Sequence, residues 1–476
     1  MHAEAGMLIG GEWRGEADAT FSVIDKHTGE SLGTLPEASP ADVEQALAAA
    51  RDAFVDWGHT PAHQRSAILL RAAHGLEAHA DELARLICRE AGKAWKYSLG
   101  EVKRAVETFT FAAEEAKRIH GETVPMDASM AGEGRVGFYL RTPVGVVVAI
   151  TPFNFPLNLV AHKVAPALAA ANTVVLKPAH ATPLTAVRLG QILGEAGLPP
   201  GVLNILHGPG GRVGEALVRH RIPAKVSFTG SPPVGERILS IAGLKKVTLE
   251  LGNNSGTLIE PDADLERAIP RCIVSAFANS GQVCISLQRL LVHEAVAEEA
   301  TRLLLQGIDD LKVGNPLDPD CDVGPMISDR AAERAESWIR EAVEQGARLL
   351  RGGRREGRLL WPCLLADTEK GMKVECEEAF APLLCLSTYR SFEEGLSRLA
   401  DTPFGLQAGI YTRDLAKAFR AVERIDAGGV MINDTSIFRV DHMPYGGNRR
   451  SGLGREGVRF AIEEMTNIRM VCFNLT

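Results

Sequence analysis

The fold of this 476-residue chain is decided by five apolar, β-branched runs: Gly145-Val-Val-Val-Ala-Ile150, Thr173-Val-Val-Leu-Lys177, Val202-Leu-Asn-Ile-Leu206, Lys225-Val-Ser-Phe228 and Val247-Thr-Leu-Glu-Leu251. Segments near 156–171, 183–197, 212–220 and 232–243 lie between them and have helical periodicity. Strands that are apolar throughout and alternate with helices predict a parallel sheet covered on both faces. The sequence therefore predicts an α/β fold.

Polar or glycine-rich residues follow these runs where the strands should end. Asn154 comes after the first run, Lys177 and His180 end the second, Gly230 follows the fourth, and Glu250 lies at the end of the fifth. Because ligands bind beyond the carboxyl ends of parallel strands, these residues predict a binding site at one edge of the sheet.

The glycines at this edge give a weaker signal. Gly230 and Gly235 delimit a Gly-x-x-x-x-Gly turn between a strand and a helix, where the backbone could approach a phosphate. An ordinary strand-to-helix turn would have the same pattern. Gly210 and Gly214, which follow the third run, are interpreted as lining of the same edge.

A candidate nucleophile follows the sheet. Cys284 ends the motif Phe277-Ala-Asn-Ser-Gly-Gln-Val-Cys284, a turn after an apolar helical stretch. A thiolate is a strong nucleophile near neutral pH, the carboxylate of Glu250 could serve as a base, and Asn154 is a neutral donor of the kind that stabilises an oxyanion. Each also has a plainer interpretation, as a buried apolar thiol, a solvated strand end and a turn residue.

Composition and charge exclude several classes of protein. A net charge of −8 and a pI near 6.0 argue against nucleic acid or an anionic membrane as a partner. We find no signal peptide and no apolar run long enough for a membrane span. The eight cysteines form no C-x-x-C pair, so we expect no metal site and a reducing, cytoplasmic location.

The rest of the chain divides around the five runs. Residues 1 to about 36 are turn-rich, and Ser39-Pro40-Ala-Asp42 begins a helical region that extends to about residue 120. Residues 121–141 predict two strands around a turn. After Cys284, helices near 293–311 and 330–347 and strands near 383–388 and 407–412 predict a second α/β domain.

Seven motifs, in order and over almost the whole chain, resemble those of the aldehyde dehydrogenase superfamily: Phe153-Asn154-Phe-Pro156, Leu176-Lys177-Pro178, Phe228-Thr-Gly230-Ser231, Leu249-Glu250-Leu-Gly252, Gly281-Gln-Val-Cys284, Glu378-Ala-Phe380-Ala-Pro382 and Tyr445-Gly-Gly to Ser451-Gly-Leu-Gly-Arg-Glu456. The resemblance implies a Rossmann-like cofactor domain at residues 1–120 and 142–252 and a catalytic domain at 253–432. It also implies an oligomerisation arm at 121–141 and 458–476, which builds a homodimer or homotetramer.

The same resemblance implies oxidation of an aldehyde to a carboxylic acid with NAD or NADP. Cys284 would attack the aldehyde, Asn154 and the Cys284 backbone N–H would hold the oxyanion, and the thiohemiacetal would become a thioester. Glu250 would activate the hydrolytic water and could also deprotonate the thiol. The implied cofactor-binding residues are Thr151, Phe153, Lys177, His180, Gly210, Gly214, Phe228, Thr229, Gly230, Ser231, Val234, Leu251, Glu378 and Phe380.

Four departures from the family pattern matter: His180, Asn253, Ala381 beside Phe380, and the triplet Asn448-Arg449-Arg450. His180 stands where NAD-preferring relatives often carry Glu, whose carboxylate accepts a hydrogen bond from the ribose 2′-hydroxyl and repels a 2′-phosphate. With Lys177 nearby, the cofactor can therefore be NADP as well as NAD. Asn253 replaces the usual second glycine after Glu250, which we expect to change the mobility of that carboxylate.

The segment from Phe438 to Tyr445 most resembles branches that act on small hydrophilic aldehydes, such as lactaldehyde, glyceraldehyde or succinic semialdehyde. The candidates for binding a hydroxyl or an anionic tail are Arg104, His162, Arg439 and His442, each of which could instead be structural. Two alternatives stay open: a CoA-acylating relative, against which Glu250 speaks, and a catalytically silent structural member of the fold.

Overall fold

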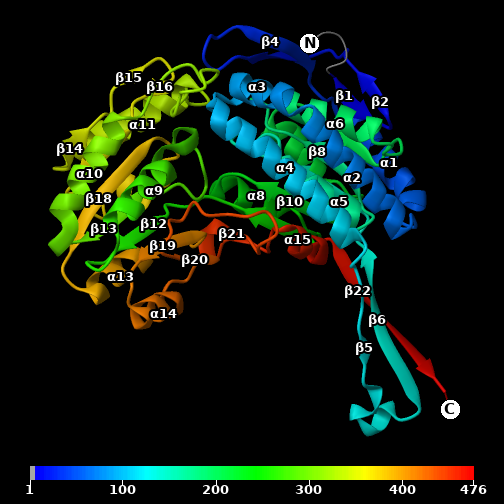
Figure 1. Ribbon diagram of the computed structural model, residues 1–476. Coiled ribbons are helices and arrows are strands. Elements are labelled where there is room, and N and C mark those ends of the chain that lie inside the picture. The colour runs from blue at the N-terminus through cyan, green and yellow to red at the C-terminus, as the bar shows by residue number, and fades with distance from the viewer. Residues whose placement is uncertain (1–5, 476) are drawn as a thin grey trace.

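The computed structural model describes residues 6–475 and consists of two α/β halves with a projecting β arm. Figure 1 shows the two sheets in separate halves of the molecule and the arm extending away from both. The α/β prediction is confirmed. Among the described residues, no helix is both long and apolar enough to cross a membrane.

The first half is built on a sheet that contains eight strands within residues 6–475. The five predicted runs form five successive strands, β7 to β11, and pair in parallel in the order β9-β8-β7-β10-β11. Antiparallel strands complete the two edges. In sheet order the strands are β2 (Glu12–Arg14), β1 (Met7–Ile9), β9 (Leu203–Ile205), β8 (Thr173–Lys177), β7 (Val146–Ile150), β10 (Lys225–Thr229), β11 (Lys246–Glu250) and β21 (Gly452–Leu453).

Helices cover both faces of this sheet, as the uniformly apolar strands require. Val147 packs into the core under α2, α4, α5 and α6, while its neighbour Val148 packs into the opposite core under α1, α7 and α8. Successive side chains of a strand point to opposite faces, which is why both must be apolar. The helices are α1 (Pro40–Trp57), α2 (Ala62–Ala78), α3 (Ala80–Ala91), α4 (Trp95–Ala116), α5 (Asn158–Ala169), α6 (Leu184–Glu195), α7 (Glu215–Arg219) and α8 (Pro232–Ile241).

The predicted start of the helical region is confirmed in detail. Ser39 caps α1 by accepting a hydrogen bond from the backbone of Asp42, whose carboxylate accepts in return from the backbone N–H of Ser39. This reciprocal capping box satisfies two of the free N–H groups at the helix start. A hairpin of β3 (Thr20–Ile24) and β4 (Ser31–Pro36) precedes it.

The second half contains the predicted second α/β domain. Within the described chain its seven strands pair in parallel except for the edge strand β14, and a small hairpin of β15 (Arg355–Glu356) and β16 (Leu359–Leu360) lies outside the sheet. In sheet order the strands are β14 (Arg348–Arg351), β17 (Cys363–Ala366), β18 (Leu383–Tyr389), β13 (Arg289–His293), β12 (Gly256–Ile259), β19 (Gln407–Tyr411) and β20 (Gly429–Ile432). The helices are α9 (Leu265–Phe277), α10 (Ala297–Asp309), α11 (Asp329–Glu344), α12 (Lys373–Cys376), α13 (Phe392–Ala400) and α14 (Leu415–Arg424).

The arm consists of β5 (Thr123–Val124), β6 (Arg135–Pro143) and β22 (Thr466–Asn474) in one antiparallel sheet. Its C-terminal segment begins later than the expected residue 458. Residues 458–464 instead form α15 (Val458–Glu464), which packs against α4 and α5. The reason is that Val458 and Ile462 bury their side chains in the core of the first half.

Candidate active site

A tight left-handed turn carries the thiol into the space between the two halves. Helix α9 ends at Phe277, and Asn279, Ser280 and Gly281 follow with φ values of 51°, 55° and 67°. A Cβ at Gly281 would lie 2.0 Å from the carbonyl oxygen of Ala381, so a side chain cannot be accommodated there. The turn therefore depends on this glycine, and Cys284 emerges three residues after it.

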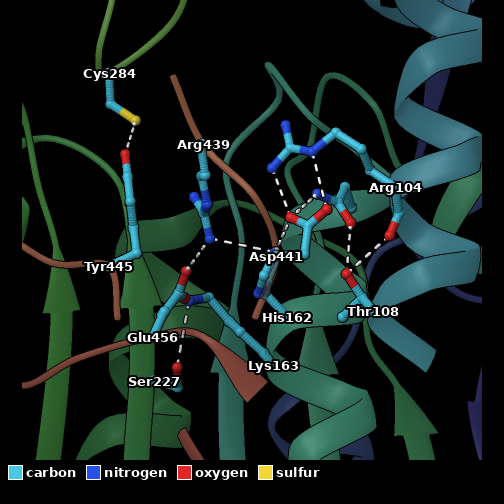
Figure 2. Close-up of polar contacts among 11 residues, drawn as sticks. Arg104, Thr108, His162, Lys163, Ser227, Cys284, Arg439, Asp441, Tyr445 and Glu456 are labelled. Atoms are coloured by element: carbon cyan, nitrogen blue, oxygen red, sulfur yellow. Dashed lines mark hydrogen bonds and ion pairs between the residues drawn. The ribbon is translucent and has the colours of Figure 1, made fainter. Parts of the chain in front are cut away.

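The Cys284 thiol lies against a tyrosine hydroxyl. Its Sγ is 2.9 Å from the Oη of Tyr445, and the two side chains point toward one another in Figure 2. Burial raises the pKa of the thiol to about 11, while the Tyr445 hydrogen bond and the positive charge of Arg439 act in the opposite direction. These two neighbours favour the thiolate, which is the nucleophilic form.

Glu250 ends β11 inside the protein. Its side chain is buried, and both carboxyl oxygens lack a hydrogen-bond partner among the described residues. Burial raises the pKa of Glu250 well above its usual value, and the negative charge of Glu456 adds to this shift. For Glu456, burial acts in the same direction, but Lys163 at 2.6 Å, His162 and Arg439 together outweigh it and lower the pKa to about 2. Two neighbouring carboxyl groups thus differ in charge because only one has a partner.

Asn154 is hydrogen-bonded to the loop that carries the thiol. Its Nδ2 donates to the carbonyl oxygen of Gln282 at 2.9 Å, and Asn279 donates to the backbone oxygen of Asn154 at 3.1 Å. Its Oδ1 is buried without a partner among the described residues. The structure therefore brings Asn154, which follows β7, to the loop of Cys284, which follows α9.

The predicted cofactor residues lie along the carboxyl edge of the first sheet. Buried hydroxyls of Thr151 and Thr229, at the ends of β7 and β10, have no hydrogen-bond partner among the described residues. The Lys177 amine donates to the backbone oxygen of Pro178 at 3.1 Å, and burial lowers its pKa to about 8. Unpaired buried donors at a strand edge are suited to a polar ligand, so these residues fit a dinucleotide.

His180 and the glycine segments complete this edge. The His180 ring stacks on Phe21 with centroids 3.8 Å apart. Gly210–Gly214 forms one π-helical turn before α7, and its Arg212 makes an ion pair with Glu37. Sequence reasoning missed Arg212, although its position beside the predicted glycines was a usable signal. Of the remaining predicted residues, Phe228 and Leu251 are buried and Gly230, Ser231 and Val234 lie at the surface or close to it.

The two predicted residues from the second half also reach this region. Glu378 accepts a hydrogen bond from the backbone N–H of Asn253 at 2.9 Å, which connects it to the loop after Glu250. Burial raises the pKa of Glu378 to about 7. The Phe380 ring packs edge-on against Phe153, with centroids 5.8 Å apart.

A cavity of about 340 Å³ opens beside Cys284 and Tyr445. Two of the four candidate substrate residues, Arg104 and Arg439, line it, together with Lys93 and Phe155. The lining contains several cationic side chains, which is a suitable environment for an anionic group.

Asp441 holds Arg104 in place. It accepts two hydrogen bonds from the Arg104 guanidinium, at 3.0 and 2.6 Å, and lies 2.7 Å from the Nε2 of His162 (Figure 2). Arg439 lies 3.2 Å from the same His162 nitrogen and 3.4 Å from Glu456. One buried carboxylate thus connects both arginines, one directly and the other through His162.

The other two candidate substrate residues lie elsewhere. His162 is fully buried behind Asp441, and burial and Arg439 lower its pKa. His442 is exposed, with its ring 5.0 Å from that of Phe111. Neither lines the cavity, because α5 directs His162 into the core and the loop directs His442 outward. Asp441 contacts His162 and Arg104 and directly precedes His442 in the sequence, but it was not predicted.

Comparison with known proteins agrees with this geometry. The model of the aldehyde dehydrogenase family matches residues 13–471. The chain belongs to the aldehyde dehydrogenase family. It is an NAD(P)-dependent aldehyde dehydrogenase, and the predicted resemblance is confirmed.

Three relatives show how far the likeness of this aldehyde dehydrogenase extends. It is 46% identical to the 3-sulfolactaldehyde dehydrogenase of Priestia aryabhattai, over 99% of this chain and 98% of the relative. Aldehyde dehydrogenase 21 from Physcomitrella patens, in complex with the reaction product succinate, superposes with a TM-score of 0.97 at 37% identity, covering 100% and 99% of the two chains. Glyceraldehyde-3-phosphate dehydrogenase GapN from Methanocaldococcus jannaschii, complexed with NADP, gives 0.92 at 38% identity, covering 95% and 98%.

Proposed function

We propose that this enzyme oxidises a small aldehyde with an anionic tail to the carboxylic acid, through a thioester on Cys284. The observation that carries the proposal is the cavity in which Arg104 and Arg439 line the same space as Cys284. A carboxylate, sulfonate or phosphate that contacts these cations would leave its aldehyde carbon near the sulfur. Charge-assisted hydrogen bonds from arginine to such groups are strong and directional.

The residues around the thiol support a covalent mechanism. The Cys284 thiolate adds to the aldehyde carbon, and the second N–H of the Asn154 amide, with the Cys284 backbone N–H, stabilises the oxyanion. NAD or NADP, held by the strand-edge residues, supplies the hydride acceptor when bound. Glu250 then takes a proton from water, which attacks the thioester carbon and releases the acid and the thiol. A buried carboxyl with a raised pKa is suited to this task when ionised.

The names of relatives are consistent with an acidic tail. The sulfolactaldehyde enzyme carries a sulfonate in its substrate name, the moss enzyme binds succinate, and the archaeal enzyme is named for a phosphorylated aldehyde. Their shared feature is a short carbon chain with an anion at the end remote from the aldehyde. Which anion this enzyme prefers is a matter for assay of all three classes.

Removal of the thiol tests the proposal. Cys284→Ala should abolish aldehyde-dependent reduction of NAD and NADP, because no other group can form the thioester. The control is Cys376→Ala, which removes a half-buried thiol that lies outside the cavity lining. Aldehydes with carboxylate, sulfonate and phosphate tails should be compared with uncharged propanal. Normal activity of Cys284→Ala, or a preference for propanal, would contradict the proposal.

Retention of Glu250 favours water over CoA as the acceptor of the acyl group. The product assay should therefore give free acid at the same rate with and without CoA. Acyl-CoA formation would instead support a CoA-acylating enzyme. A catalytically silent protein would show neither product, although Cys284, Glu250 and Asn154 are all present.

We further propose a preference for NADP. Lys177, His180 and Arg212 supply positive or protonatable groups at the edge where the adenosine ribose should lie, and Arg212 could exchange its Glu37 partner for a 2′-phosphate. Initial rates with NAD and NADP should show the preference, and His180→Glu should weaken it. A strong preference for NAD in the unaltered enzyme would contradict this.

Homo-oligomerisation and a cytoplasmic location stay predictions. Strands β6 and β22 expose apolar side chains along the arm: Val136, Leu140, Ile468, Met470 and Phe473. Exposed apolar patches of this kind are typical of interfaces. Sedimentation analysis should give a dimer or a tetramer, and a monomer would contradict the prediction.

A further inference from the structure

The Cys284 thiol is hydrogen-bonded to Tyr445 and not to a base. The Cys284 Sγ lies 2.9 Å from the Tyr445 hydroxyl, whereas both carboxyl oxygens of Glu250 lack a hydrogen-bond partner among residues 6–475. Within the described part of the chain, the Tyr445 hydroxyl is the one group that is hydrogen-bonded to the sulfur. A mechanism with only Cys284, Glu250 and Asn154 leaves this contact without a role.

Tyr445 is held rigidly. Its backbone exchanges two hydrogen bonds with Glu456, at 3.0 and 2.6 Å, as an isolated antiparallel bridge. Its side chain is buried, and it packs with Val283 and Ile285, the neighbours of the thiol. The hydroxyl therefore cannot move away from the sulfur without displacement of the loop that carries it.

Arg439 makes the tyrosine a better donor. Its guanidinium carbon lies 3.6 Å from the centre of the Tyr445 ring, and its side chain is almost fully buried. A cation on the face of a phenol ring withdraws electron density and strengthens the O–H as a donor. Burial raises the pKa of the Tyr445 hydroxyl well above its usual value, so it keeps its proton.

We propose that Tyr445 is a further catalytic residue, whose hydroxyl donates a hydrogen bond to the Cys284 thiolate, stabilises it and holds it toward the aldehyde cavity. The thiol proton leaves to Glu250 or to water, and Tyr445 retains its own proton throughout. When the sulfur bonds to the aldehyde carbon, it loses its negative charge and the hydrogen bond weakens. This role rests on the proposed function, because it requires Cys284 to be the nucleophile.

The titration of the thiol tests the proposal. Iodoacetamide should be reacted with the enzyme in brief pulses across pH 7 to 13 without aldehyde, and the alkylated Cys284 peptide should be quantified by mass spectrometry. In Tyr445→Phe the midpoint of the alkylation rate should rise by about one pH unit, since the thiolate loses a charge-assisted hydrogen bond. The midpoint is the required quantity, because a thiolate of higher pKa is intrinsically more reactive and partly masks a loss in rate.

Tyr97→Phe is the matched control. Tyr97 lines the same cavity, yet its hydroxyl makes no hydrogen bond to the sulfur, so the alkylation midpoint should equal that of the unaltered enzyme. Incorporation of difluorotyrosine at 445 supplies an opposite test that keeps the ring and the hydroxyl, and it covers the case in which Tyr445→Phe fails to fold. A more acidic phenol should lower the midpoint.

The outcomes separate the two claims. An unchanged midpoint in Tyr445→Phe, with Cys284→Ala inactive, would overturn the role of Tyr445 and leave the proposed function intact. Full activity of Cys284→Ala would overturn both. A raised midpoint together with a lower kcat/KM for the aldehyde, at unchanged melting temperature, is the result that we expect.

Discussion

The two sides of the Cys284 loop are built in different ways. On one side, Asn154, Lys177 and Glu250 lie at the ends of parallel strands of one sheet, and several polar atoms of Asn154 and Glu250 are buried without a partner among the described residues. On the other side, the aldehyde cavity is lined by α4, by the Cys284 loop and by residues 437–445, and its charged groups are held in ion pairs.

This difference between unpaired polar atoms and paired charges corresponds to two different tasks of the site. Unpaired polar atoms at the sheet edge are available to bind a ligand or a water. Since no side chain among the described residues holds them, it is the strands alone that position them. The cavity instead holds cationic side chains near a nucleophile, and those cations need fixed partners so that they do not disorder the site. Asp441 supplies this for Arg104, at distances of 3.0 and 2.6 Å.

The largest expected effect comes from the sheet side. Glu250→Gln should lower kcat by about 10²- to 10⁴-fold, because the water that hydrolyses the thioester loses its base. The first turnover should survive as a burst of about one equivalent of reduced cofactor per active site, measured by stopped-flow absorbance. Glu90→Gln changes a carboxyl that is also buried, between α3 and α6, and should retain steady hydrolysis. Loss of the burst in Glu250→Gln would mean that Glu250 also removes the thiol proton.

A smaller effect is expected on the cavity side. Arg104→Met should lower kcat/KM for an aldehyde with an acidic tail by about ten- to hundredfold, since a hydrogen bond to a charged group is worth about 1.5–3 kcal/mol. Uncharged propanal should react at its former rate. Lys103→Met, one residue earlier on the exposed face of α4, is the matched control. Equal losses for both substrates would show that Arg104 only supports the fold.

The smallest effect concerns the boundary between the sides. The negative charge of Glu456 raises the pKa of Glu250, so Glu456→Gln should lower that pKa. More Glu250 is then ionised at acidic pH, and the acidic limb of the kcat profile should move to lower pH by about one unit. Lys163, freed from its partner at 2.6 Å, acts in the same direction. A shift to higher pH would contradict this account of the coupling.

The sheet side could be predicted from sequence because its geometry is repetitive. Parallel strands bring their carboxyl ends to one edge, so residues that follow Val146–Ile150 and Lys246–Glu250 must lie near each other whatever separates them in the chain. Cys284 was identified from a different local signal, a glycine turn after an apolar helix. The resemblance to a family then connected these residues to a reaction.

The cavity side could not be predicted in this way. Arg104 and Asp441 are 337 residues apart, and their pairing depends on how the C-terminal loop docks onto α4. His162 lies close to the cavity, yet the orientation of α5 buries its side chain behind Asp441, so it does not line the cavity. The predicted start of the arm at residue 458 was wrong for a related reason. Val458 and Ile462 are four residues apart, which is the spacing of one face of a helix, and they bury their side chains in the core of the first half.

The C-terminal loop has a consequence for how the enzyme is made. Strand β21 pairs with β11. The backbone oxygen of Ser451 accepts a hydrogen bond from the N–H of Leu251, and its hydroxyl donates to the carbonyl oxygen of Gly252, both directly after Glu250. Tyr445, Asp441 and Glu456 belong to the same late segment. Synthesis runs from the N-terminus, so the strands of the second sheet and the parallel strands of the first are made while the thiol still lacks its tyrosine and Arg104 still lacks its carboxylate. The centre of the nascent chain is therefore incomplete until the segment from Asp441 to Glu456 has left the ribosome.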